Sequence, residues 1–199
     1  MTKITRPYKI LVAGVGGQGV VFLTKLIVKA ALLYDVPVAT SEIHGLAQRG
    51  GSVSAGITLG ENTFGYIERG GVDLLLGLEP LEAQRCVTYL NKKSSAVIDH
   101  YRILPFAVNA GMASYPDVHA FIDYLNKQIK KVLYIDEDIQ SIKPIQRNLL
   151  VLANACLHTD FPIPDLFIEK AISLLAKKGM ADESLRAFRS VRKEKEVLK

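Results

Sequence analysis

The stretch LVAGVGGQGVVF, residues 11–22, decides the fold because it joins an apolar strand to an apolar helix through a glycine-rich turn. Residues 8–14 form a short, mostly apolar run closed by glycine, which is typical of a buried strand. Residues 20–34 have the length of a helix and are apolar on nearly every side, which predicts burial. With residues 36–42 as a second strand, this part of the chain predicts a right-handed βαβ unit.

The rest of the chain continues the alternation of strands and helices. Residues 52–71 alternate in polarity and turn at 60–62, which predicts a hairpin or strand pair. Further strands are expected at 72–79, 94–100 and 131–136, and helices at 80–90, 116–129, 145–158, from 164 and from 182. The pattern predicts one domain over residues 1–199. Its fold class is α/β: a three-layer α/β/α, Rossmann-like architecture with a mostly parallel, mixed sheet and a helical C-terminal third.

Composition is that of an ordinary globular protein, with 49% apolar residues in a chain of 199. No apolar run approaches the roughly 20 residues that span a bilayer, and the polar start does not resemble a signal peptide. We therefore expect a cytoplasmic protein. Much of the net charge of +5 lies in the last predicted helix, where glutamates interrupt the basic residues. This favours a solvated helix face or a surface for a protein partner over nucleic-acid binding.

The two cysteines, Cys86 and Cys156, stand 70 positions apart and lack C-x-x-C spacing. Both are expected to be small core residues, and this chain alone is not expected to bind an iron–sulfur cluster.

The turn Gly14-Val15-Gly16-Gly17-Gln18-Gly19 fits the pattern G-x-G-x-x-G between a strand and a helix. In that pattern, Gly14 permits a tight turn, Gly16 lets the backbone approach a phosphate, and Gly19 lets helix and strand pack closely. The first N–H groups of the helix point at any anion placed there. The alternative is that the glycines serve helix packing alone.

A second candidate segment is SEIHGLAQRGGSVSAG, which follows the second predicted strand. A loop at the carboxyl end of a strand faces the ligand crevice of an open α/β sheet. Arg49 offers a planar fork for a phosphate or carboxylate, and Gly50 and Gly51 allow close approach of a partner. For His44 an ordinary surface role is favoured, and for Arg49 a surface role and a binding role are weighted equally.

A nicotinamide cofactor is not favoured, because that site needs an acidic residue at the end of the second strand. The strand ends in Ala39-Thr40-Ser41 with Glu42 running into the loop, so Glu42 would serve only if the strand is longer than predicted. A self-contained NAD(P)-dependent reductase stays open as an alternative, although no Tyr-x-x-x-Lys pair stands out. A scaffold protein that uses its basic last helix is a third possibility.

Three motifs in order, GVGGQGV, SEIHGLAQRGGSV and LLLGLEPLEAQR, resemble the gamma domain of the 2-oxoacid:ferredoxin oxidoreductases. The resemblance runs from Lys9 to about Pro116, and the H-G-x-A-Q-R-G-G form points to the indolepyruvate branch. The pyruvate and 2-oxoglutarate branches, whose gamma subunit is the alternative, carry a different loop before the arginine.

The resemblance implies a subunit that is inactive alone and has no catalytic or metal-binding residue of its own. Thiamine diphosphate, Mg²⁺ and iron–sulfur clusters are expected on a partner alpha subunit, and ferredoxin is expected to act through the complex. The turn would face coenzyme A or that subunit, with no nucleic acid and no membrane as partner. The expected cofactor-binding residues are Gly14, Gly16, Gly17, Gln18, Gly19, Ser41, Gln48, Arg49, Gly50 and Gly51.

Overall fold

A computed structural model describes residues 4, 6–44, 51–61, 63–136, 142–177 and 179–197, with residues 42–44 and 192–197 as backbone. Its centre is a six-stranded sheet in the order β2-β3-β1-β4-β5-β6. The strands are β1 (Tyr8–Val15), β2 (Val38–His44), β3 (Ser52–Leu59), β4 (Leu74–Gly77), β5 (Ser95–Asp99) and β6 (Lys131–Ile135). Parallel pairing joins β1 to β4, β4 to β5 and β5 to β6, whereas β3 runs antiparallel to both of its neighbours. The predicted mixed, mostly parallel sheet is confirmed.

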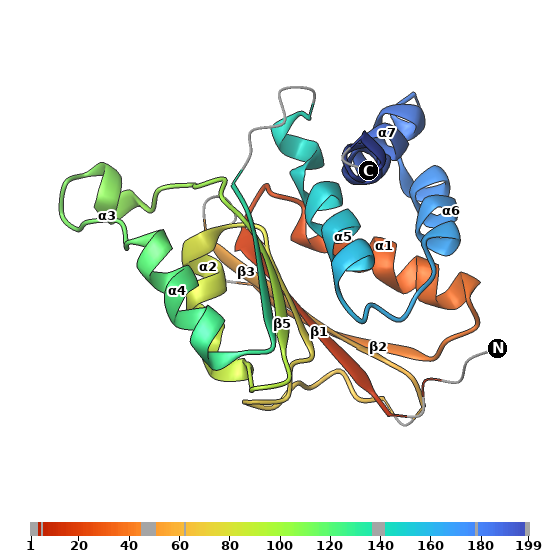
Figure 1. Ribbon diagram of the computed structural model, residues 1–199, viewed down its shortest axis with the longest axis horizontal. Helices are drawn as coiled ribbons and strands as arrows, with labels where there is room; N and C mark the ends of the chain where they lie inside the picture. The colour runs from red at the N-terminus through yellow and green to blue at the C-terminus, as the bar shows by residue number, and fades with distance from the viewer. Residues whose placement is uncertain are drawn as a thin grey trace.

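Helices cover both faces of this sheet (Figure 1). One face carries α1 (Val20–Leu33), α5 (Arg147–His158), α6 (Asp165–Leu175) and α7 (Ala181–Val197). The other carries α2 (Pro80–Arg85) and α4 (Val118–Gln128), and the short α3 (Phe106–Asn109) stands away from both layers. Two 3₁₀ turns, η1 (Val87–Tyr89) and η2 (Pro144–Gln146), complete the elements.

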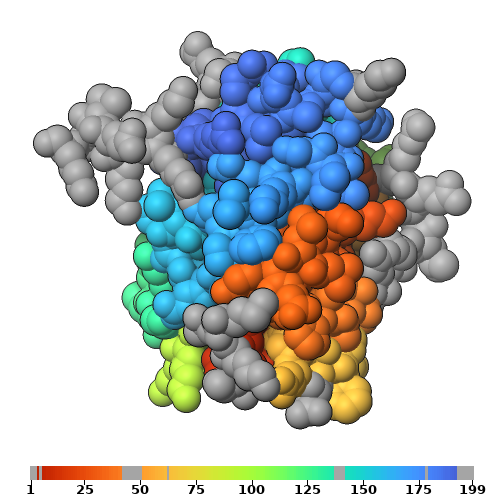
Figure 2. All heavy atoms as spheres, turned by 90° about the vertical axis from the view of Figure 1, so that its right-hand side faces the viewer, coloured from red at the N-terminus to blue at the C-terminus, as the bar shows by residue number. Residues whose placement is uncertain are grey.

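Two hydrophobic cores hold the layers together, one on each face of the sheet. The larger core packs α1, α5 and α6 against inward residues such as Ile10, Ile57 and Leu74, all fully buried. The smaller core packs α4 against Leu75 and Ile98 through Phe121 and Leu125. Figure 2 shows the first face from outside, where α6 and α7 lie beside α1. The buried side chains of α1 confirm that this helix is enclosed on most sides.

The main difference from the sequence prediction concerns the second and third strands. The predicted βαβ unit has β1 and β2 in the same direction, but β3 lies between them and pairs with both. Of the hairpin or strand pair predicted at 52–71, the first strand is confirmed as β3, but the second is wrong, because the described residues after Gly60 form no strand before β4. The insertion of β3 beside β2 follows from the short connection between them, since adjacent antiparallel strands need no long crossover.

Smaller differences concern the ends of elements. The predicted helix at 80–90 ends at Arg85 and continues as the 3₁₀ turn η1, although Pro80 does occupy its first turn. The last helix begins at Ala181, so Asp182 lies in its first turn and is not its N-cap. Cys156, expected to be a core residue, is only half-buried.

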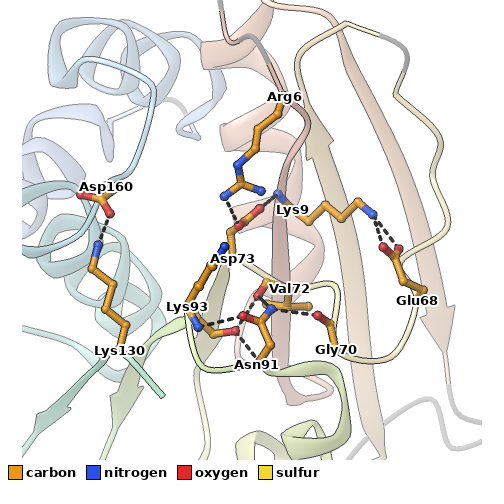
Figure 3. Close-up of polar contacts among 11 residues, drawn as sticks. Arg6, Lys9, Glu68, Gly70, Val72, Asp73, Asn91, Lys93, Lys130 and Asp160 are labelled. Carbon is orange, nitrogen blue, oxygen red and sulfur yellow. Dashed lines mark hydrogen bonds and ion pairs between the residues drawn. The ribbon is translucent and has the colours of Figure 1, made fainter. Parts of the chain in front are cut away.

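The amino-terminal edge of the parallel strands is closed by polar contacts within the chain (Figure 3). The Asp73 carboxylate accepts from the Arg6 guanidinium at 2.7 Å and from the Lys9 N–H at 2.9 Å. Lys9 Nζ lies 2.6 Å from the Glu68 carboxylate, and Asn91 Nδ2 donates to the Gly70 carbonyl at 2.8 Å. These contacts tie β1, β4 and the approach to β5 together, which is a structural role. In an open α/β sheet, a ligand site is expected at the opposite, carboxyl-terminal edge.

Candidate functional site

The glycine turn lies at the carboxyl end of β1 and is held by the side chain of Gln18. Gln18 Oε1 accepts from the Val15 N–H at 2.8 Å, and Gln18 Nε2 donates to the Leu78 carbonyl at 2.8 Å. The amide thus joins the end of β1 to the residue that follows β4. Gln18 was predicted to contact a ligand, but its side-chain oxygen and nitrogen both form hydrogen bonds within the protein.

Backbone groups of the turn are also paired within the chain. The Gly16 N–H donates to the Gly51 carbonyl at 2.9 Å, and the Gln18 N–H donates to the Val15 carbonyl at 3.0 Å. Gly16 and Gly51, two predicted site residues, are therefore brought together, but through a bond that uses the N–H expected to approach a phosphate. The positive end of the α1 dipole remains the feature of the turn that favours an anion.

Glycine is required at the positions of the turn for different structural reasons. Gly17 and Gly19 have φ angles of 104° and 85°, a region that disfavours other residues. Gly14 lies within β1, and a Cβ there would lie 3.1 Å from Leu78 Cβ and 3.1 Å from Val20 Cγ2. The close packing of strand and helix predicted for Gly19 is thus found at Gly14. Gly19 instead faces α5, where its added Cβ would lie 2.3 Å from Asn148 Nδ2.

Asn148 closes this side of the turn from the first helical turn of α5. Its Nδ2 donates to the Gln18 carbonyl at 3.3 Å, and its side chain is 3% exposed. Its Oδ1 has no hydrogen-bond partner among the described residues. An unsatisfied buried oxygen costs free energy, so this atom is a place where a water or ligand donor would stabilise the turn. The sequence patterns did not single out Asn148, because it lies 129 positions after Gly19.

Two buried glutamates lie on the other side of the turn, at the start of α2. Glu79 caps α2 by accepting from the Glu82 N–H at 3.0 Å, and its other oxygen accepts from the Tyr115 hydroxyl. Glu82 accepts from Ser52 Oγ at 2.5 Å and pairs with Arg85 at 3.0 Å. Because Ser52 pairs with Val15 in the sheet, this carboxylate adds negative charge near the turn. Arg85 pairs with this carboxylate, so its charge already has a partner cation within α2.

A third buried group lies at the carboxyl end of β5. Arg147, at the start of α5, binds the Asp99 carboxylate through two nitrogens, at 2.7 Å and 2.5 Å. The guanidinium carbon lies 5.5 Å from the centre of the Tyr101 ring, and His100 Nδ1 contacts the Ile135 carbonyl at 2.9 Å. This pair fixes α5, and with it Asn148, against the sheet.

The structure separates Ser41 from the turn. Ser41 pairs with Gly56 in the sheet, and Gly56 pairs with Leu11. Ser41 is thus level with a residue four positions before the end of β1, or about 13 Å along the strand. Glu42 and His44 lie inside β2, whose end comes later than predicted. Gln48, Arg49 and Gly50 lie outside the described residues, so their predicted contacts stay predictions.

The cysteines do not form a metal or cluster site with each other. Burial and the nearby Glu82 carboxylate raise the pKa of the Cys86 thiol to about 12. Cys86 belongs to the smaller core and Cys156 packs against the larger core on the other face, so the sheet separates the two side chains. Within the described residues, no group of three or more His, Cys, Asp or Glu side chains is arranged to hold a metal ion. Across the same residues, no helix combines the length and the apolar character needed to cross a membrane.

Comparison with known proteins gives relatives along nearly the whole chain. An indolepyruvate oxidoreductase subunit IorB from Archaeoglobus fulgidus is 33% identical over 90% of this chain and 91% of its own length. The subunit of that name from Methanothermobacter thermautotrophicus is 33% identical over 92% of this chain and 94% of its own. The resemblance proposed from the three motifs, and its indolepyruvate branch, is confirmed.

Solved structures show the same fold at lower identity. The gamma subunit of a keto/oxoacid ferredoxin oxidoreductase from Geobacter sulfurreducens has a TM-score of 0.64 at 18% identity, covering 92% of this chain and 94% of its own. A 2-oxoglutarate:ferredoxin oxidoreductase from Magnetococcus marinus has a TM-score of 0.68 at 17% identity. The match covers 94% of this chain but 30% of that one. The family model for pyruvate ferredoxin/flavodoxin oxidoreductase matches residues 9–194, and the chain belongs to this family.

Proposed function

We propose that this chain is the beta subunit of an indolepyruvate, or more broadly arylpyruvate, ferredoxin oxidoreductase. The complex would carry out the coenzyme A-dependent oxidative decarboxylation of an aryl 2-oxo acid to an aryl-acetyl-coenzyme A, with reduction of ferredoxin. The observation that carries the proposal is the identity of 33% to two indolepyruvate oxidoreductase subunits over at least 90% of each chain. Residues 1–199 are proposed to form one domain, which the family match over 9–194 supports.

The redox cofactors belong on a companion alpha subunit in this proposal. Thiamine diphosphate, with its Mg²⁺, supplies the carbanion chemistry when bound, and iron–sulfur clusters carry the electrons. A cluster needs several cysteine thiolates, and this chain has two cysteines, which lie on opposite faces of the sheet. The residues of this chain do not fit a cluster. In this proposal the chain binds coenzyme A or the companion subunit and helps to shape and enclose the site.

Coenzyme A is the ligand proposed for the glycine turn, with the companion subunit as the alternative occupant. The positive end of α1 favours a phosphate there. The side chain of Gln18 and the N–H of Gly16 are already engaged, so their role is to hold the turn. Arg49, whose planar fork suits a phosphate, is the residue that we propose contacts the anion.

We propose a cytoplasmic location, which keeps thiols reduced.

Reconstitution tests the proposal. The purified chain alone should be colourless and should not reduce a viologen dye with indolepyruvate and coenzyme A. Adding the companion subunit of the same organism, loaded with thiamine diphosphate and clusters, should produce dye reduction. Turnover or an iron–sulfur absorbance from the lone chain would overturn the assignment. Higher activity with pyruvate or 2-oxoglutarate would keep the family and reject the indolepyruvate branch.

A further inference from the structure

A small cavity lies where the segment before α5 meets the first turns of α7, in a part of the molecule that the proposed function does not use. Its volume is about 160 Å³, and it is lined by Ile142, Gln146, Glu183, Arg186, Ala187 and Ser190. The helices α5 and α7, which meet beside it, pack against each other (Figure 1). We call the space enclosed by these six residues the α5–α7 cavity.

Gln146 brings a buried amide with an unused donor to the cavity wall. This residue is 3% exposed, and its Nε2 has no hydrogen-bond partner among the described residues. Its Oε1 accepts from the Lys143 N–H at 3.4 Å, so a flipped amide, which would turn Nε2 toward that N–H, is disfavoured. A buried donor without an acceptor costs free energy, so an acceptor placed in the cavity would stabilise it.

The position of this amide is fixed from both sides along the chain. The Gln146 N–H donates to the Lys143 carbonyl at 2.8 Å, within the 3₁₀ turn η2. The next residue, Arg147, binds the buried Asp99 carboxylate at the end of β5 through two nitrogens. The unused donor is therefore built into the fold and does not belong to a loose surface side chain.

The charged residues around the cavity leave one cation over. Lys143 Nζ lies 2.7 Å from the Glu183 carboxylate, so the charges of these two side chains offset each other. Arg186, on α7, is exposed and forms no ion pair or hydrogen bond within the described part of the chain. The lining thus carries one uncompensated positive charge.

The unused donor and the uncompensated charge define the chemistry of a ligand. An amide N–H and a guanidinium both need an acceptor, and a carboxylate supplies two acceptor oxygens with one negative charge. One excess positive charge suits a monoanion, whereas the Glu183 carboxylate would repel a dianion. Ile142 and Ala187 are 8% and 5% exposed, and they give the cavity an apolar wall that an inorganic anion would leave uncovered.

The volume limits the ligand to a small molecule. A cavity of about 150 Å³ is large enough for benzene, so the α5–α7 cavity has room for roughly six heavy atoms. We infer that it binds a short-chain monocarboxylate, whose carboxylate accepts from Gln146 Nε2 and the Arg186 guanidinium and whose apolar chain packs against Ile142 and Ala187. This inference goes beyond the proposed function and does not depend on it.

The experiment titrates the purified full chain with isobutyrate at constant ionic strength and follows the binding by nuclear magnetic resonance. Isobutyrate should bind with a Kd of about 1 mM, and the signals of the Gln146 side-chain amide and the Ile142 methyl groups should shift. Isobutyramide, which has the same shape without the charge, should bind at least about tenfold more weakly. Arg186→Gln should weaken isobutyrate binding by about ten- to hundredfold, because it removes a charge-assisted hydrogen bond.

Two further variants separate the site from general effects of charge and folding. Gln146→Met removes the unused donor and should weaken isobutyrate binding by about tenfold. Its unfolding temperature should stay within a few degrees of wild type, because the lost bond to Lys143 is long and a buried unpaired group is removed with it. The matched control is Arg189→Gln, which removes the same charge from α7 at a residue outside the cavity that pairs with Glu169. It should bind isobutyrate as wild type does.

Several results would refute the inference. Equal affinity for isobutyrate and isobutyramide would exclude recognition of a carboxylate. Wild-type affinity in both Arg186→Gln and Gln146→Met, or an equal loss in Arg189→Gln, would place the binding outside the cavity. No change in any signal up to about 50 mM isobutyrate would show that the cavity holds solvent only. Tighter binding of inorganic phosphate than of isobutyrate would reject a monocarboxylate. The proposed function is tested separately, by reconstitution with the companion subunit.

Discussion

Replacing Gln18 tests whether the glycine turn is held by its own side chain. In Gln18→Met, the Val15 N–H and the Leu78 carbonyl lose their partners at 2.8 Å. Both residues are nearly buried, at 4% and 3% exposure, so water replaces the amide poorly. Each lost bond and stranded group costs about 1–2 kcal/mol, giving a total of about 2–4 kcal/mol. For a chain of this size, that loss lowers the unfolding temperature by roughly 10 °C.

The variant Gln18→Glu separates the two hydrogen bonds. A carboxylate still accepts from the Val15 N–H, but its second oxygen faces the Leu78 carbonyl where an N–H had donated. The folded-state pKa of that introduced carboxyl is expected to lie above its unfolded value of about 4.3, because only the protonated form can donate to Leu78. The loss of stability should therefore be small below about pH 4 and grow as the pH rises through the folded-state pKa.

Urea denaturation at several pH values, with coenzyme A binding measured in parallel, decides the matter. The control is Gln84→Met, on the exposed face of α2, which should change the free energy of unfolding by less than about 0.5 kcal/mol. A Gln18→Met protein with wild-type stability but weaker coenzyme A binding would refute the structural role and make Gln18 a ligand contact.

Three further perturbations test neighbouring features. Gly19→Ala should be destabilising because of the φ angle of Gly19 and its close approach to Asn148. In urea denaturation, the double variant Gly19→Ala/Asn148→Ala should lose less free energy of unfolding than the sum of the two single variants. Additive costs would contradict the contact. Arg49→Lys should weaken coenzyme A binding by about ten- to hundredfold, because lysine loses the planar fork, and wild-type affinity for Arg49→Ala would remove Arg49 from the site. With a disulfide reagent at pH 8, Cys86 should react more slowly than Cys156, because burial raises the Cys86 pKa to about 12; faster labelling of Cys86, identified in Cys156→Ser, would contradict this.

The fold class was predictable because hydrophobic runs and glycine punctuation are local signals. The run at residues 8–14 and the apolar segment at 20–34 produce β1 and α1 nearly as predicted. Strand order is a long-range property, and here local reasoning failed. The alternating pattern predicts β3 as a strand, but its place between β1 and β2 depends on its pairing with both, which the local pattern does not reveal.

The shape of residues 103–116 was missed because this segment has no local pattern. Residues 103–116 lack the periodicity of a helix or the alternation of a strand, so no pattern singles them out. Their shape comes from short backbone turns and from Tyr115, whose partner Glu79 lies 36 positions earlier. A long uncharged stretch between two predicted elements was the available signal, but its exposure becomes known only once the core has been filled by other residues.

The glycine turn shows how one motif can serve two purposes that the sequence does not separate. The spacing G-x-G-x-x-G predicts a tight connection between a strand and a helix, and the structure has one. Whether its N–H groups are free for an anion depends on what else reaches them. Here the Gly51 carbonyl, which the tertiary fold brings to Gly16, and the Gln18 side chain, only three positions from Val15, do so. A turn so engaged is rigid before any ligand arrives. The turn then helps to bind a phosphate through the fixed direction of α1, and the positive charge must come from outside the turn. The Arg49 variants test the charge and Gln18→Met tests the rigidity of the turn, so the two tests are independent.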